Sequence, residues 1–199
     1  IEVNHTSYNK HYFGGIVAFN YGKIENCMII GTGINIQTLA EVSGGFAGVY
    51  VGGCAAVNGG QGSIRNCSCI VEKISGGGYI GGIVGLNYGN VTDCMISARA
   101  CLLFFINGTL GGIVGTNYGT VSDCICGNSD SIVGLEYAGS ASNSTVFNPY
   151  MGYIIGKNLG TMLNCRHEGM WLSKGALTTV NRHDQAQYVG SKSNGLIGG

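Results

Sequence analysis

A glycine-rich motif recurs along this chain of 199 residues, and such a repeat restricts the possible folds more than any other feature of the sequence. The clearest copy, residues 81–94, reads Gly-Gly-Ile-Val-Gly-Leu-Asn-Tyr-Gly-Asn-Val-Thr-Asp-Cys, and residues 111–124 repeat it with three changes. Further matches occupy residues 14–27, 52–67, 152–165 and, with serine in place of the final cysteine, 131–144. Because a repeat unit buries its apolar face only against its neighbours, about six copies predict a solenoid.

The copies are unevenly spaced. Cys67 and Cys94 are 27 residues apart, whereas Cys124 and Cys165 are 41 residues apart and enclose the serine-containing copy. The long step from Cys27 to Cys67 leaves room for a degenerate unit around residues 44–48. Uneven spacing is typical of a solenoid whose extra residues loop outward at the corners.

Each unit has the composition of strands joined by a turn. Ile-Val-Gly-Leu is short and apolar, and the following Asn-Tyr-Gly is a turn signal because Asn and Gly tolerate positive φ. The residues after the turn alternate, so that Val91 and Asp93 point to one side and Thr92 and Cys94 to the other. The sequence therefore predicts an all-β, parallel β-helix-like solenoid over residues 1–165. Residues 166–199 are expected to form an irregular cap or to begin a further repeat.

Equivalent residues of stacked units are expected to form columns at the ~4.8 Å strand spacing. The predicted aliphatic column contains Ile16, Ile83, Ile113, Ile132 and Ile154. The predicted asparagine column contains Asn20, Asn58, Asn87, Asn117 and Asn158. An internal amide ladder is favoured for it over a polar binding groove, since the turn backbone needs partners. The tyrosines that follow, Tyr21, Tyr88, Tyr118 and Tyr137, are expected to pack at a corner, although a row of aromatic rings also suits sugar binding.

The chain contains nine cysteines. Five are equivalent by repeat and should line one side of the stack: Cys27, Cys67, Cys94, Cys124 and Cys165. Cys69 and Cys126 lie two residues further on and point to the same side, and Cys54 occupies an aliphatic position. A buried thiol column is favoured over disulfides between neighbouring units. Only Cys-x-Cys spacing occurs, so no metal site is predicted.

Composition excludes several classes of protein. Ten basic and ten acidic residues cancel to a net charge of +0, which disfavours a nucleic-acid binder. No apolar run approaches the roughly 18 residues of a membrane-spanning helix. The 45% of hydrophobic residues provides a core and disfavours disorder.

No catalytic or cofactor-binding motif was found around the four histidines, His5, His11, His167 and His183. Asp93 and Asp123 are equivalent to Asn26, Asn66 and Asn164, which indicates a turn role rather than acid–base chemistry. Among five Asn-x-Ser/Thr triplets, Asn4 and Asn107 are the favoured glycosylation acceptors in a secreted protein.

The recurring Gly-Gly-Ile-Val-Gly-x-Asn-x-Gly core resembles the GLUG motif repeat of bacterial surface and secreted proteins, including non-catalytic regions of immunoglobulin A peptidases. The resemblance covers most of residues 14–165. It implies a β-solenoid on an extracellular or cell-surface protein and brings no established activity with it.

Two functions are therefore expected. The first is a non-catalytic structural or interaction module, such as a stalk, an adhesin-like spacer or a filament subunit. Its partners would be other surface proteins, glycans or, head to tail, other copies of itself. The alternative is a carbohydrate-binding or polysaccharide-active β-helix module.

Overall fold

A computed structural model describes residues 2–5, 10–31, 34–38, 48–76, 78–97, 101–104, 108–127, 132–137, 150–168 and 170–174. Every regular element in this part of the chain is a β-strand, and all strand pairs within its five sheets are parallel. The expected all-β solenoid is confirmed. No helix among the described residues is long and apolar enough to cross a membrane.

In each coil, a strand of sheet A is followed along the chain by a strand of sheet B. Sheet A contains β1 (Glu2–His5), β6 (Ile34–Thr38), β11 (Lys73–Gly76), β16 (Cys101–Phe104), β21 (Ile132–Tyr137) and β26 (Met170–Lys174). Sheet B contains β2 (His11–Gly14), β7 (Val49–Gly52), β12 (Tyr79–Gly81), β17 (Thr109–Gly111) and β22 (Tyr150–Gly152).

Three further sheets complete the circuit. Sheet C contains β3 (Val17–Asn20), β8 (Ala55–Asn58), β13 (Val84–Asn87), β18 (Val114–Asn117) and β23 (Ile155–Asn158). Sheet D contains β4 (Lys23–Glu25), β9 (Ser63–Arg65), β14 (Asn90–Thr92), β19 (Thr120–Ser122) and β24 (Thr161–Leu163). Sheet E contains β5 (Met28–Gly31), β10 (Ser68–Val71), β15 (Met95–Ser97), β20 (Ile125–Cys126) and β25 (Arg166–His167).

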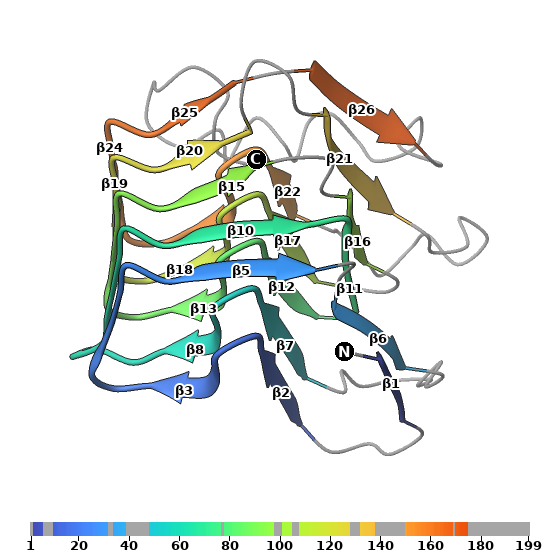
Figure 1. Cartoon of the computed structure of the whole chain (residues 1–199), viewed down its shortest axis with the longest axis horizontal. Coiled ribbons are helices and arrows are strands. Elements are labelled where there is room, and N and C mark those ends of the chain that lie inside the picture. The colour runs from blue at the N-terminus through green and yellow to red at the C-terminus, as the bar shows by residue number, and fades with distance from the viewer. Residues whose placement is uncertain are drawn as a thin grey trace.

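One strand from each sheet, in the order A to E, makes one coil of the solenoid. Coils 1 to 5 contain β1–β5, β6–β10, β11–β15, β16–β20 and β21–β25, and β26 begins a sixth coil. The coils stack along one axis, with sheet E in front in Figure 1. The solenoid continues past residue 165 through β25 and β26, while residues 175–199 lie outside the described part.

The corner between sheets B and C folds inward at paired glycines. A Cβ atom on Gly53, Gly82 or Gly112 would lie within 2.6 Å of Cys69 Sγ, Ile96 Cδ1 or Cys126 Sγ, respectively, all on sheet E. The corner backbone therefore packs directly against the opposite sheet.

The hydrophobic core runs through all coils between this corner and sheets D and E. Its columns include Ile64, Val91 and Val121 of sheet D, all fully buried. The expected aliphatic column is present at the B–C corner, where Ile83, Ile113 and Ile154 are fully buried and Cys54 occupies the coil 2 position.

Two sequence expectations about this column need correction. Ile132 does not belong to it, because Ile132–Tyr137 forms β21 of sheet A and pairs with β16 and β26. The described part of the serine-containing match, residues 132–137, is thus a plain strand rather than a copy of the corner motif. Ile16 occupies the column but is 41% exposed, since no described strand lies beneath coil 1.

Candidate functional site

The asparagine column lies inside the turn between sheets C and D. Its side chains form a chain of hydrogen bonds in which each Nδ2 donates to Oδ1 of the next coil. The distance is 2.8 Å at each of the four steps along Asn20, Asn58, Asn87, Asn117 and Asn158. Asn58, Asn87 and Asn117 are fully buried.

The same amides also bind the turn backbone. Asn87 Oδ1 accepts from Gly89 N at 3.2 Å, and its Nδ2 contacts the carbonyl oxygens of Gly89 and Thr120 at 3.1 and 3.4 Å. Burial and full hydrogen bonding leave these amides no capacity for an external ligand. The column holds neighbouring coils together.

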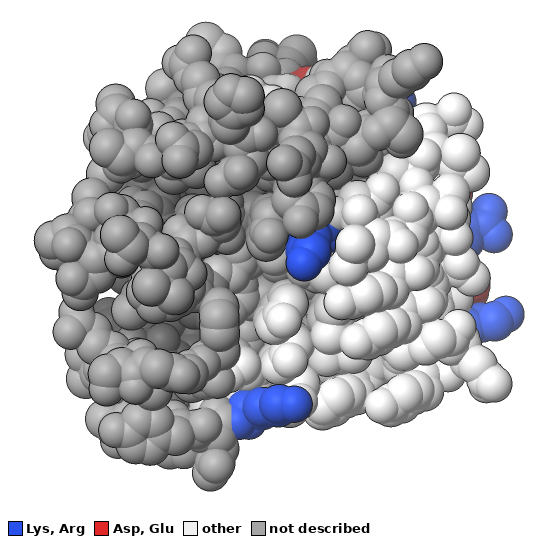
Figure 2. All heavy atoms as spheres, turned by 180° about the vertical axis from the view of Figure 1, so that it is seen from behind, with Lys and Arg blue, Asp and Glu red and all other residues white. Residues whose placement is uncertain are grey.

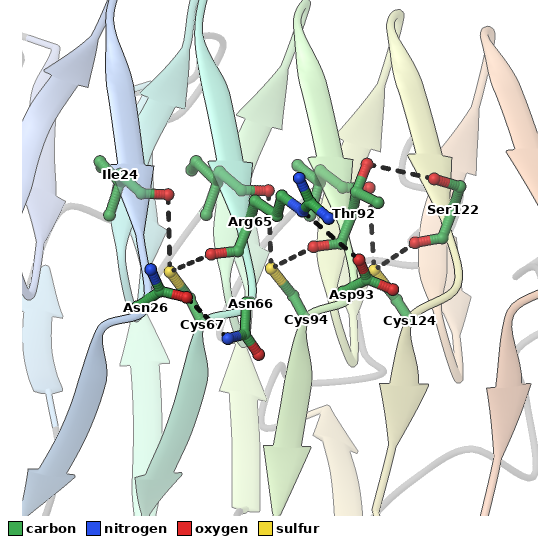
Figure 3. A network of polar contacts seen from close by, with 12 residues as sticks. Ile24, Asn26, Arg65, Asn66, Cys67, Thr92, Asp93, Cys94, Ser122 and Cys124 are labelled. Atoms are coloured by element: carbon green, nitrogen blue, oxygen red, sulfur yellow. Dashed lines mark hydrogen bonds and ion pairs between the residues drawn. The ribbon is translucent and has the colours of Figure 1, made fainter.

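The thiol column lies at the next corner, between sheets D and E. Cys67 Sγ donates to Arg65 O at 3.2 Å and lies 3.6 Å from Ile24 O of the coil below, and Cys94 repeats this geometry with Thr92 O and Ile64 O. Figure 3 shows Cys67, Cys94 and Cys124 side by side in equivalent positions. Each thiol therefore links the backbone of two coils.

All eight described cysteines are free thiols, and Cys27 is the one that is not buried. Cys101 is the ninth, and its side chain lies outside the described part. Cys69 and Cys126 point into the core from sheet E, where burial raises the pKa of each thiol from 9.0 to about 12. These thiols stay protonated at neutral pH and are poor nucleophiles.

We expect alkylation to distinguish Cys27 from the other described cysteines. In native protein treated with iodoacetamide, Cys27 should react first, because it lies half-exposed on coil 1 whereas the others are buried. Peptide mass spectrometry over time measures the order. Equal rates for Cys27 and Cys94 without unfolding would contradict the buried column.

We also expect stability to fall at high pH. A thiol whose pKa is raised on folding contributes stability below its unfolded pKa of 9.0 and loses it as the pH rises toward about 12. The free energy of unfolding, measured with urea between pH 8 and about 11, should decrease less steeply in a Cys126→Ala variant than in the wild type. Parallel curves would show that Cys126 does not ionise on unfolding.

The corner residue just before each cysteine of the thiol column adopts a left-handed conformation. Asn26, Asn66, Asp93, Asp123 and Asn164 have φ between 49° and 57°. Asn and Asp are the non-glycine residues that best tolerate this region. Asn66 Nδ2 donates to Asn26 Oδ1 at 2.7 Å, and Arg65 Nε lies 3.6 Å from Asp93 Oδ2 (Figure 3). The two aspartates thus have the turn position that the sequence predicted for them.

Replacing Asp123 by Asn should stabilise the fold. Asp93 and Asp123 occupy the same position in coils 3 and 4, so their carboxylates repel across one strand spacing, and Asn keeps the left-handed conformation. We expect a gain of about 0.5 kcal/mol, as for other exposed charge pairs, that shrinks in 1 M salt. Urea unfolding at low and high salt measures it, and Asp123→Ala, which lacks the Asn preference for positive φ, is the control.

The tyrosines after the asparagine column are only partly stacked. Tyr88 and Tyr118 stack with ring centroids 5.0 Å apart and are 47% and 48% exposed, but Gly59 separates Tyr88 from Tyr21. Tyr137 lies in β21 of sheet A and does not join this column, so its predicted place is wrong.

A second aromatic column, on sheet B, was not foreseen from the sequence. Tyr12, Tyr50 and Tyr79 stack with centroid distances of 4.8 and 4.7 Å. Tyr12 and Tyr50 pack on Val57 and Leu86 of sheet C, and burial with the neighbouring tyrosines raises the pKa of Tyr50 to about 12. Each of these tyrosines stands two residues before the first glycine of a motif copy, a signal present in the sequence.

The candidate catalytic groups are dispersed. His167 lies on sheet E next to Tyr153, with ring centroids 4.5 Å apart, and burial lowers the pKa of the imidazole. His5 lies in β1, His11 in β2, and His183 outside the described residues. Within the described part of the chain, no group of three His, Cys, Asp or Glu side chains is placed to hold a metal ion.

The favoured glycosylation acceptors remain predictions. Asn4 lies in β1, of which only the backbone is described, and Asn107 lies outside the described residues. Asn66 and Asn90, from the other triplets in the described part, are exposed.

Comparison with protein-family models found no matching family, and comparisons with curated proteins and with solved structures found no match either. The likeness to GLUG repeats therefore rests on the motif residues alone.

Proposed function

We propose that this chain is a non-catalytic rod segment of an extracellular or cell-surface protein. In such a segment the number of coils sets the distance between the parts on either side. The observation that carries the proposal is the asparagine column, whose 2.8 Å bonds run through all five coils. The location rests on the resemblance to GLUG repeats.

The distribution of reactive groups supports a structural role. The buried members of the thiol column are bonded to backbone carbonyls, and the corner carboxylates occupy left-handed turn positions. On the side opposite sheet E, Figure 2 shows a few separate Lys and Arg side chains and little Asp or Glu over the described part of the surface. The thiols thus join one coil to the next, and the carboxylates belong to the corner turns.

A rod segment should tolerate loss of one complete coil. Deleting residues 84–113 joins Ile83 to Val114, which is the register partner of Val84, so the coils on either side can stack directly. We expect this variant to fold with β-rich circular dichroism and to be shorter by about 5 Å in small-angle scattering. Failure of this variant to fold would contradict the modular rod.

The matched control removes part of a coil. Deleting residues 84–97 takes away β13, β14 and β15 and would connect sheet B to sheet A without sheets C to E. This deletion should abolish folding although it removes fewer residues.

Carbohydrate binding is the second candidate, favoured by the exposed Tyr88–Tyr118 pair. Stacking uses the facing surfaces of the two rings and leaves their edges and outer faces for a sugar. A glycan array separates the candidates. Selective binding that is lost in a Tyr88→Ala, Tyr118→Ala double variant would favour the carbohydrate-binding or polysaccharide-active module.

A further inference from the structure

The lower face of coil 1 has the properties of an interior surface. Each of the strands β1 to β5 lies at the edge of its sheet, so one backbone edge of all five strands has no strand partner among the described residues. Open edges of this kind are sites where another strand adds.

The side chains on this face are apolar and exposed. Ile16 is 41% and Phe19 43% exposed, whereas Ile83 and Leu86, their equivalents in coil 3, are 0% and 8% exposed. Covering these side chains would remove apolar area from water, which favours binding.

The hydrogen bonds of the asparagine column determine the orientation that a partner must have along the solenoid axis. In coil 3, Asn87 Oδ1 accepts two bonds, one from Gly89 N and one from Asn58 Nδ2 of the coil below. Among the described residues, Asn20 Oδ1 accepts from Gly22 N alone, at 3.1 Å, while its own Nδ2 donates upward to Asn58. The position below Asn20 therefore matches an amide donor.

We propose that this face binds one further solenoid coil of the same repeat, stacked in parallel beneath coil 1, with an asparagine Nδ2 that donates to Asn20 Oδ1. A two-fold pairing of two such faces does not fit, because it would place acceptor against acceptor. The inference rests on the proposed rod function and identifies the partner that binds the coil 1 end of the rod.

The test supplies the coil directly. A copy of residues 73–102, which contains coil 3 and its connection to the next strand of sheet A, is joined before Glu2 of the full chain, because Glu2 is the register equivalent of Leu103. The added coil should raise the melting temperature by several degrees and slow alkylation of Cys27 at least about tenfold, since burial controls thiol access. The control carries N87D in the copied coil only, which replaces the amide donor by an acceptor, and it should lose most of both effects.

The outcomes are distinct from those of the coil deletion. If Cys27 is alkylated at the wild-type rate in the extended chain, the inference is wrong, while a folded deletion variant would leave the rod function standing. Sedimentation of the wild type adds a second outcome. A series of growing oligomers at high concentration, with Cys27 protected, would support the proposal, because parallel head-to-tail stacking lets a second copy supply the coil. A closed dimer would contradict it, because a dimer of this kind pairs two equivalent faces.

Discussion

Gly81→Ala should unfold this protein or leave it barely stable. A Cβ atom on Gly81 would lie 2.0 Å from Val84 O of the same coil and 2.8 Å from both Gly115 N and Ile113 O of the next coil. All three contacts are backbone atoms, which cannot rotate away as a flexible side chain can. We expect a loss of at least about 3 kcal/mol in the free energy of unfolding, the upper range for overpacked sites. Urea unfolding followed by circular dichroism measures it.

Gly60→Ala is the matched control for this prediction. Gly60 is exposed in the turn after β8, and no atom lies within 4 Å of the position of its Cβ. The two variants add the same methyl group, so equal losses of stability would show that the tight corner is not the cause.

Coil 5 indicates why the second glycine of the corner is not needed everywhere. A methyl carbon added at Gly15, Gly53, Gly82 or Gly112 would lie 2.0–2.2 Å from the carbonyl oxygen of the equivalent residue in the next coil. Tyr153 takes this position in coil 5, over which no described strand of sheets B or C is stacked. The requirement for glycine thus comes from the coil above.

The columns were predictable from sequence because parallel stacking keeps equivalent residues in register. Once one copy of the motif is placed in the stack, the positions of Asn87 and Cys94 follow from their places in their own copy. The turn role of this corner was predictable for the same reason, since only Asn or Asp occurs at the position before each cysteine of the thiol column.

Other features could not be read from the motif. Ile132–Tyr137 matches the apolar residues of the motif, but Ile-Val-Gly-Leu is also compatible with a plain strand. This match lacks the pair of glycines that forms the inward corner. The strands of sheet A lie outside the motif copies, which is why the circuit of five strands was not foreseen. The tyrosine column of sheet B was hidden because Thr109 interrupts it in coil 4, where its hydroxyl bonds to that of Thr116 at 2.8 Å.

Asn87→Asp should strongly destabilise the fold although it is isosteric. The carboxylate keeps the two bonds that Asn87 Oδ1 accepts, from Gly89 N and Asn58 Nδ2. The other oxygen replaces Nδ2 and would face three acceptors, Asn117 Oδ1 and the carbonyl oxygens of Gly89 and Thr120. A fully buried charge with repelling neighbours should cost at least about 3 kcal/mol at pH 7.

The pH dependence identifies the charge as the cause. Burial raises the pKa of the introduced carboxyl group above its unfolded value of about 3.9. The deficit relative to the wild type should therefore be smallest below about pH 4 and grow as the pH rises through the raised pKa. Urea unfolding of both proteins at each pH gives the difference.

Asn158→Asp is the control that separates the amide column from a general effect of the substitution. Asn158 is half-exposed in coil 5, and its Oδ1 accepts from Asn117 Nδ2 and Gly160 N. An aspartate keeps both accepted bonds, and within the described part of the chain no acceptor is bonded to Asn158 Nδ2 that its second oxygen would repel. We expect a loss of no more than about 1 kcal/mol, since only a partly solvated charge is introduced. If the two variants lose equal stability, the bonds that Asn87 Nδ2 donates do not stabilise the stack of coils. The asparagine column would then no longer support the proposed rod function.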